Sequence, residues 1–143
     1  MKTLKPVIRL HKWQLEEKRR DLGLLNGLRA DLVKQAADLE LELRREQANA
    51  AQDAEANWTY GMYALNVIRR RANIQRSIKG IDERIEAARR EVEAAHRELR
   101  KYEIAEENAR LRIAQEESRR EQSELDEIAL NQDRARKLEL NVD

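Results

Sequence analysis

The strongest constraint in the sequence is an apolar stripe that repeats at alternating intervals of four and three residues from Tyr60 to Ile113. Every position of this stripe, which we call the second seam, is apolar or aromatic except Arg71 and Glu106. Its members are Tyr60, Ala64, Val67, Arg71, Ile74, Ile78, Ile81, Ile85, Ala88, Val92, Ala95, Leu99, Tyr102, Glu106, Ala109 and Ile113. A repeat averaging about 3.5 residues places its members on one face of an underwound α-helix, which supercoils around a partner helix. The second half of the chain is therefore predicted to be one long coiled-coil helix.

A looser stripe with the same spacing, the first seam, runs from Ile8 to Ala50. Its members are Ile8, His11, Leu15, Lys18, Leu22, Leu25, Arg29, Leu32, Ala36, Leu39, Leu43, Glu46 and Ala50. Four further large apolar residues lie outside it and are expected to widen its apolar face: Leu24, Leu28, Val33 and Leu41. Because each seam has to be covered by another helix, the two seams are predicted to pack against each other or against copies of themselves.

The seams are separated by residues 50–59, ANAAQDAEAN, which contain no long apolar side chain and in which Asp53 or Asn57 can cap the following helix. A turn there makes the helices antiparallel and places residue 60 opposite about residue 50, and residue 106 opposite about residue 4. We therefore expect an all-α fold, an antiparallel two-helix coiled-coil hairpin with a longer, overhanging second helix. The expected organisation is a single coiled-coil domain over residues 1–143, with helix 1 over about 5–52, the turn over about 53–58 and helix 2 over about 59–138.

Composition also favours a thin helical protein. Charged residues make up 40% of the chain, against about 25% in ordinary globular domains, so a thick apolar core is excluded. Pro6 is the only proline and there are four glycines, which argues against turn-rich β and α/β folds. Without cysteine there are no disulfides or thiolates, and His11 and His96 are too far apart in sequence to form a local metal-binding pair.

Nothing in the sequence indicates an enzyme. The motifs that bind nucleotides, a zinc ion or an acyl group are missing, and a two-helix rod offers no enclosed pocket, so we expect no catalytic residue, cofactor or metal site. The formal net charge of +1 argues against nucleic acid as a partner, although a nucleic-acid-binding rod stays an alternative. Neither a spanning apolar run nor a secretory leader is encoded, so we expect a cytoplasmic protein.

Two tryptophans lie outside both seams. Trp13 comes two positions after a seam residue and Trp58 two positions before one, so both are expected to project from the coiled coil. Exposed tryptophan is a favoured anchor for partner proteins. A further stripe with three-four spacing lies on a different face of helix 2 and is a candidate docking surface: Met62, Leu65, Arg69, Ala72 and Arg76.

Charge is unevenly distributed along the second half of the chain. Residues 57–102 carry eleven basic and six acidic side chains, whereas residues 103–127 carry four basic and nine acidic ones. Such blocks are typical of a solvated helix face. The functional alternative is that the two ends bind different partners.

Three segments and the polar tail resemble the FliJ family, small coiled-coil proteins of the bacterial flagellar export apparatus. The segments are LKPVIRLHKWQLEEKRRDLGLL at the start, NWTYGMYAL at the turn and REVEAAHRELRKYEIAEE in the second helix. The resemblance extends over nearly the whole chain.

The resemblance implies a cytoplasmic antiparallel coiled coil, similar to the central stalk of rotary ATP synthases. Such a protein binds the hexameric export ATPase FliI through its open end, contacts the export gate protein FlhA, and escorts export chaperones. It promotes ATP-linked secretion of flagellar subunits, and hence motility and chemotaxis, at the inner face of the cell membrane at the flagellar base. Residues 1–20 and the tail beyond about residue 110 would then enter the ATPase ring.

Two sets of residues are assigned to these contacts. The ATPase contact at the open end is expected to involve Leu4, Val7, Leu10 and Trp13. The family's gate contact lies at the start of the second helix, and the individual positions are our own inference: Trp58, Met62, Leu65, Arg69, Ala72 and Arg76.

Two alternatives share the coiled-coil architecture. One is the equivalent stalk of a virulence-type injectisome, which differs only in its partners. The other is a parallel homodimeric scaffold without a motor partner, which is disfavoured because Lys18, Arg29 and Glu46 would each meet their own copy. A monomeric hairpin is the expected state.

Overall fold

Two α-helices form the fold. The structure, a computed structural model, describes residues 3–52 and 54–141, with the side chains of 54–57 left out. Helix α1 spans Lys5–Ala50 (46 residues) and helix α2 spans Ala54–Leu140 (87 residues). The residues described contain no strand. The predicted all-α fold with a longer second helix is confirmed.

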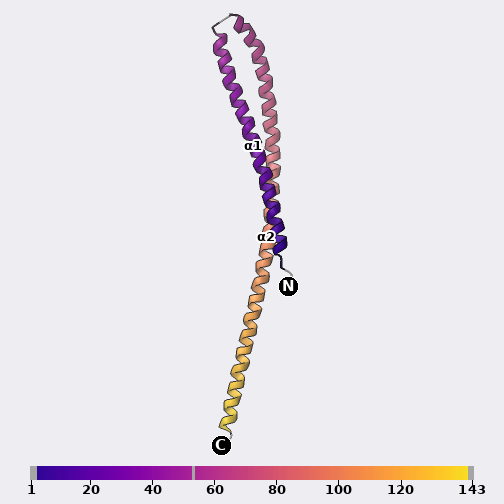
Figure 1. The fold of residues 1–143 in the computed structure, drawn as a ribbon, viewed down its shortest axis with the longest axis vertical. Helices are drawn as coiled ribbons and strands as arrows, with labels where there is room; N and C mark the ends of the chain where they lie inside the picture. The colour runs from indigo at the N-terminus through magenta and orange to yellow at the C-terminus, as the bar shows by residue number, and fades with distance from the viewer. Residues whose placement is uncertain (1–2, 53, 142–143) are drawn as a thin grey trace. The chain divides into compact units, whose positions relative to one another are not determined.

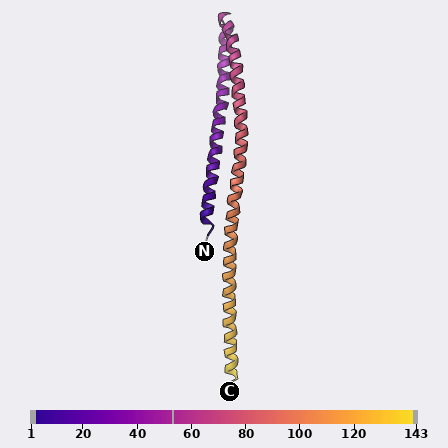
Figure 2. The ribbon, with the colours of Figure 1, turned by 90° about the vertical axis from the view of Figure 1, so that its right-hand side faces the viewer.

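The chain divides into two compact units. One comprises Leu10–Glu98 and is called the paired unit; the other comprises Met1–Arg9 with Leu99–Asp143 and is called the end unit. In the paired unit, α1 and α2 lie side by side and are joined at the turn (Figures 1 and 2).

Ion pairs show that the two helices of the paired unit are antiparallel. Lys18 pairs with Glu91 at 3.2 Å, and Glu40 pairs with Arg71 at 2.5 Å. From the first pair to the second, the residue on α1 lies closer to the turn, and so does its partner on α2. This is the antiparallel register predicted from the position of the turn.

The core of the paired unit is narrow and follows the two seams. Its buried side chains are Leu15, Leu39, Ala50, Val67 and Ile85. Every second-seam position from residue 60 to residue 95 is buried or half-buried. The first seam is covered in the same way, except at two charged positions whose side chains reach the solvent, Arg29 and Glu46.

The expectation that four off-seam residues widen the first seam is wrong. Leu24, Leu28, Val33 and Leu41 are all exposed. A helix with one partner buries only the stripe that faces that partner, and α1 has α2 as its single described neighbour here.

The helix ends differ from the predicted boundaries. Helix α1 ends at Ala50, and α2 already begins at Ala54, so residues 54–58 are helical instead of forming the turn. Asn57 therefore lies inside α2 and not at its first position, while Asp53 lies outside the described residues. Alanine favours helix without needing a packing partner, so the absence of large apolar residues did not indicate a loop. The single-domain organisation stays a prediction.

In the end unit, the N-terminal residues cover only the beginning of the α2 segment. Leu99 is buried, and Tyr102, Glu106 and Ala109 are half-buried. From residue 110 to residue 141, every side chain is exposed, including Ile113 at the end of the seam. Figure 2 shows this part of α2, from orange to yellow, continuing as a single helix. The predicted overhang is confirmed, and the apolar pattern stops where the partner helix stops.

Within residues 3–52 and 54–141, neither helix contains a segment that is long and apolar enough to span a membrane.

Candidate partner-binding surfaces

Trp13 projects from α1 into solvent. Its side chain is 62% exposed, whereas Leu15, two positions later, is buried against α2. A two-residue step rotates a helix by about 200°, so residues two apart point in opposite directions. Leu10, one turn before Trp13, is also exposed. The predicted projection of Trp13 is confirmed.

The other two residues predicted for the ATPase contact are less accessible. Leu4 and Val7 belong to the end unit and are half-buried. Leu4 directly precedes α1, and its carbonyl accepts a hydrogen bond from the N–H of Ile8 at 2.9 Å. The four predicted residues are therefore divided between the two units, and only Leu10 and Trp13 are exposed.

The predicted gate stripe lies on one helix of the paired unit. Trp58 is 80% exposed, and Met62 and Leu65 are exposed with it. Further along α2, Arg69 and Arg76 are exposed and Ala72 is half-buried. The structure thus brings the six residues together along α2, outside the core.

Ile68 is a large exposed side chain in the same part of α2. It does not follow the three-four spacing that starts at Met62, and for that reason the sequence pattern did not include it. The sequence pattern nevertheless indicates that Ile68 is exposed, because Ile68 directly follows the seam residue Val67, which is fully buried.

The two arginines of the stripe differ in their surroundings. The guanidinium of Arg76 donates to the side-chain oxygen of Asn73 at 2.5 Å and to the carbonyl of Ala72 at 3.4 Å. Arg69 forms no ion pair with any described residue. Arg69 therefore presents the less constrained positive charge for an acidic group of a partner.

A polar layer joins α1 to α2 beside this stripe. The guanidinium of Arg71 pairs with Glu40 at 2.5 Å, and that of Arg70 lies 3.7 Å from the carboxylate of Glu42. The Nε atom of Arg71 and the hydroxyl of Tyr63 are buried and have no hydrogen-bond partner among the described residues. Burial of its hydroxyl, reinforced by the carboxylates of Glu42 and Glu46, raises the pKa of Tyr63. This layer adds polar contacts between the two helices.

Metal-binding chemistry is not assembled in the part of the chain that the structure describes. That part holds no group of three or more His, Cys, Asp or Glu side chains that could bind a metal ion. The surfaces described above offer aromatic, aliphatic and charged contacts suited to protein partners.

Comparison with known proteins identifies the family. Neither the search of curated proteins nor the search of solved structures returned a match. The family model described as "Flagellar FliJ protein" matches residues 1–138. This match covers nearly all of a chain whose two seams form the expected helix pair, so the protein belongs to the FliJ family and is related to flagellar protein export.

Proposed function

We propose that this protein is a coiled-coil stalk and general chaperone of flagellar export, which binds the hexameric export ATPase and the export gate and promotes ATP-linked secretion. The observation that carries the proposal is the pair of exposed tryptophans, Trp13 on α1 and Trp58 on α2. Aromatic residues are only 3% of the chain, and two of the five are large indoles left in solvent. Such residues lose their unfavourable contact with water only when a partner covers them.

The ATPase contact is assigned to the open end of the hairpin. Leu10 and Trp13 of the paired unit provide its exposed apolar anchors, and Leu4 and Val7 of the end unit are assigned to the same partner. The tail beyond about residue 110, which belongs to the end unit, is exposed and is assigned to the same partner. A stalk with unequal sides interacts unequally with the subunits of a ring, and such differential binding can shift their conformational equilibrium.

The gate contact is assigned to the stripe on α2. Met62 and Leu65 provide apolar area next to Trp58, and Arg69, which pairs with no carboxylate of the described residues, provides a positive charge at its edge. Ala72 and Arg76 continue the stripe by two further turns. A central apolar patch with a charged rim is the composition expected of a transient protein interface.

The remaining assignments follow from this role. The protein acts as a monomeric hairpin in the cytoplasm, and it reaches the inner face of the membrane only through its partners. ATP hydrolysis belongs to the ATPase, and this chain contributes neither catalytic residues nor a cofactor. Export chaperones are further partners, whereas nucleic acid is not.

The ATPase contact can be tested by a pull-down from the native cytosol followed by identification of the bound ATPase. The full chain should retain the export ATPase, and a chain that lacks residues 1–12 and carries Trp13→Ala should lose it. Trp58→Ala is the matched control, because it removes the other exposed tryptophan. Equal recovery of the ATPase with all three chains would show that the open end is not its binding site.

The gate contact can be tested by replacing two residues of the stripe. Leu65→Asp combined with Arg69→Glu should weaken binding to the cytoplasmic part of the gate protein while far-UV circular dichroism stays the same. Val33→Asp with Lys34→Glu makes the same kind of change at exposed positions of α1. Unaltered gate binding by the Leu65 and Arg69 variant would rule out this surface.

A further inference from the structure

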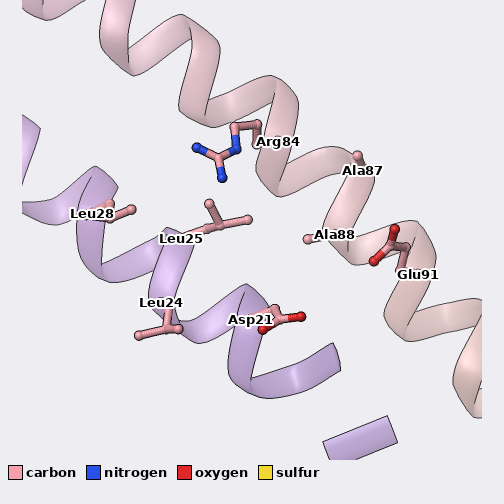
Figure 3. Close-up of a pocket in the computed structure, with 8 residues that line it drawn as sticks. All are labelled: Asp21, Leu24, Leu25, Leu28, Arg84, Ala87, Ala88 and Glu91. Atoms are coloured by element: carbon pink, nitrogen blue, oxygen red, sulfur yellow. The ribbon is translucent and has the colours of Figure 1, made fainter. Parts of the chain in front are cut away.

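A groove runs along one face of the paired unit. In one section, shown in Figure 3, its walls include Leu24 and Leu28 from α1 and Ala87 from α2. The adjoining section again contains Leu28 and adds Gly80 of α2. Arg84 lines both sections, which makes them one continuous groove. None of these residues belongs to the surfaces assigned to the ATPase or the gate.

The middle of the groove exposes apolar surface that α2 does not cover. Leu24 is 64% exposed and Leu28 is 49% exposed. On the opposite wall, Gly80 and Ala87 are seven residues apart, and a Cβ atom added to Gly80 would meet no other atom within 4 Å. The small α2 residues Gly80 and Ala87 leave room at their two levels for side chains of a further helix.

The α1 wall of the groove carries unpaired acidic residues. Asp21 and Asp31 line the two sections described above, and Asp38 lines their continuation toward the turn. All three are exposed, and none forms an ion pair with any described residue. Asp82, by contrast, pairs with Arg29 at 2.6 Å. Within the part of the chain that the structure describes, no cation is supplied to this row of carboxylates.

The opposite wall carries a positive charge at the same level. In Figure 3, the guanidinium of Arg84 extends from α2 across the groove toward Leu25. Among the described residues, Arg84 forms no ion pair either. On the α2 wall, Glu91 is neutralised by Lys18 and Arg70 lies near Glu42, so Arg84 adds the charge without an ion pair there, opposite the aspartates of α1. This difference distinguishes the two edges of any helix that lies in the groove.

We propose that this groove binds an amphipathic helix of a partner protein as the third helix of a local bundle. The partner helix places an apolar ridge between Leu24 and Leu28 on one side and Gly80 and Ala87 on the other. The edge of the partner helix that lies beside α1 carries Lys or Arg at three positions. Their spacing matches that of Asp21, Asp31 and Asp38, which are separated by ten and then seven residues. Helices packed side by side at a small angle keep such spacings in register.

The charges of the groove exclude one possible occupant, which is a segment of a second copy of this protein. Segment 103–127 of a second copy is exposed and helical, but it carries nine acidic and four basic side chains. It would place like charges against the acidic wall, which opposes binding. The acidic wall instead matches a basic helix, which the proposal assigns to a partner protein. This inference goes beyond the ATPase and gate contacts and does not depend on them.

Two synthetic peptides of about 24 residues test the proposal, a length sufficient to cover the three aspartates. Both carry the same leucine ridge; one has Lys at three positions spaced by ten and seven residues, and the other has Glu there. Fluorescence anisotropy with the full chain should show saturable binding of the Lys peptide and about tenfold weaker binding of the Glu peptide. Absence of saturable Lys-peptide binding, or equal affinity for both peptides, would overturn the proposal.

Variants then locate the bound peptide. Asp21→Lys combined with Asp31→Lys should reverse the preference, so that the Glu peptide binds more tightly. Leu24→Gln with Leu28→Gln should weaken the Lys peptide about tenfold, whereas Val33→Gln with Leu41→Gln, also exposed, should leave its affinity unchanged. Circular dichroism verifies that each variant is folded. An unchanged preference, or equal losses in both leucine variants, would place the peptide elsewhere and overturn the proposal.

Discussion

The backbone N–H of Leu4 donates a hydrogen bond to the side-chain carboxylate of Glu106, 3.1 Å away. Leu4 is the N-cap position of α1, and its aliphatic side chain cannot satisfy the free N–H groups of the first turn. The first turn of α1 contains no acidic residue either. Glu106 supplies the missing acceptor and a negative charge at the positive end of the helix dipole. The acidic interruption of the second seam therefore has a structural role in the end unit.

Replacing Glu106 by Ala should fray the start of α1. The loss of a capping interaction costs about 1 kcal/mol, and Glu106→Gln should lose less because the amide oxygen still accepts a hydrogen bond. Amide hydrogen exchange near residues 7–9 measures the effect directly. Glu107→Ala is the matched control, since Glu107 is exposed next to it. Unchanged exchange in the Glu106 variant would show that this contact does not hold the helix end.

The narrow core predicts a large contrast between two leucines of α1. Leu39 is 2% exposed and Leu41 is 50% exposed. Leu39→Ala removes buried contacts and leaves a cavity, so it should lower the free energy of unfolding by about 2–5 kcal/mol, whereas Leu41→Ala should change it by about 0.5 kcal/mol or less. Urea unfolding followed by circular dichroism measures both. Similar losses for the two variants would contradict the assigned helix phase.

The contribution of the ion pair between Arg71 and Glu40 to stability should be measurable in a charge-swap experiment. Arg71→Glu places two carboxylates together and should destabilise the helix pair by about 1 kcal/mol, a value limited by the partial exposure of both groups. Adding Glu40→Arg restores an opposite-charge pair and should recover most of the loss. Thermal unfolding of the two single variants and the double variant gives the coupling. Strictly additive effects would mean that the two side chains do not interact in solution.

Tyr63 should make the protein less stable at high pH. Its pKa is raised in the folded state by burial and by nearby carboxylates, while the unfolded chain has a tyrosine pKa of about 10. Above pH 10 the unfolded state therefore releases this proton first, and stability falls as the pH rises toward the folded-state pKa. Tyr63→Phe removes this contribution. Urea midpoints between about pH 9 and pH 11 should fall more steeply in the unmodified protein, and equal slopes would refute this role of Tyr63.

Helix phase was the most predictable property of this chain. The intervals of three and four residues placed Leu39 and Ile85 in the core and turned Trp13 and Trp58 outward, and the structure agrees at all four positions. The helix phase alone determines whether these side chains are buried or exposed, because each helix has one described partner and therefore one covered face. The antiparallel register followed from the position of the turn.

Other features depend on contacts that the apolar pattern does not encode. Leu24 and Leu28 looked like a wider apolar face, but their burial requires a third helix. Glu106 looked like a flaw in the second seam until the register placed it next to the start of α1. This contact with Glu106 also leaves Leu4 half-buried, although a residue near the end of a chain is usually expected to be exposed.

The most direct test of the proposed role is the rate of ATP hydrolysis by the cognate export ATPase as this protein is added. The unmodified chain should raise the rate in a saturable manner, and so should Leu65→Asp with Arg69→Glu, because the gate stripe is not needed for this contact. Leu10→Asp with Trp13→Ala should lose the stimulation while keeping its helical circular dichroism. No stimulation by the unmodified chain, or equal stimulation by the Leu10 and Trp13 variant, would contradict the proposal that the open end acts on the ATPase.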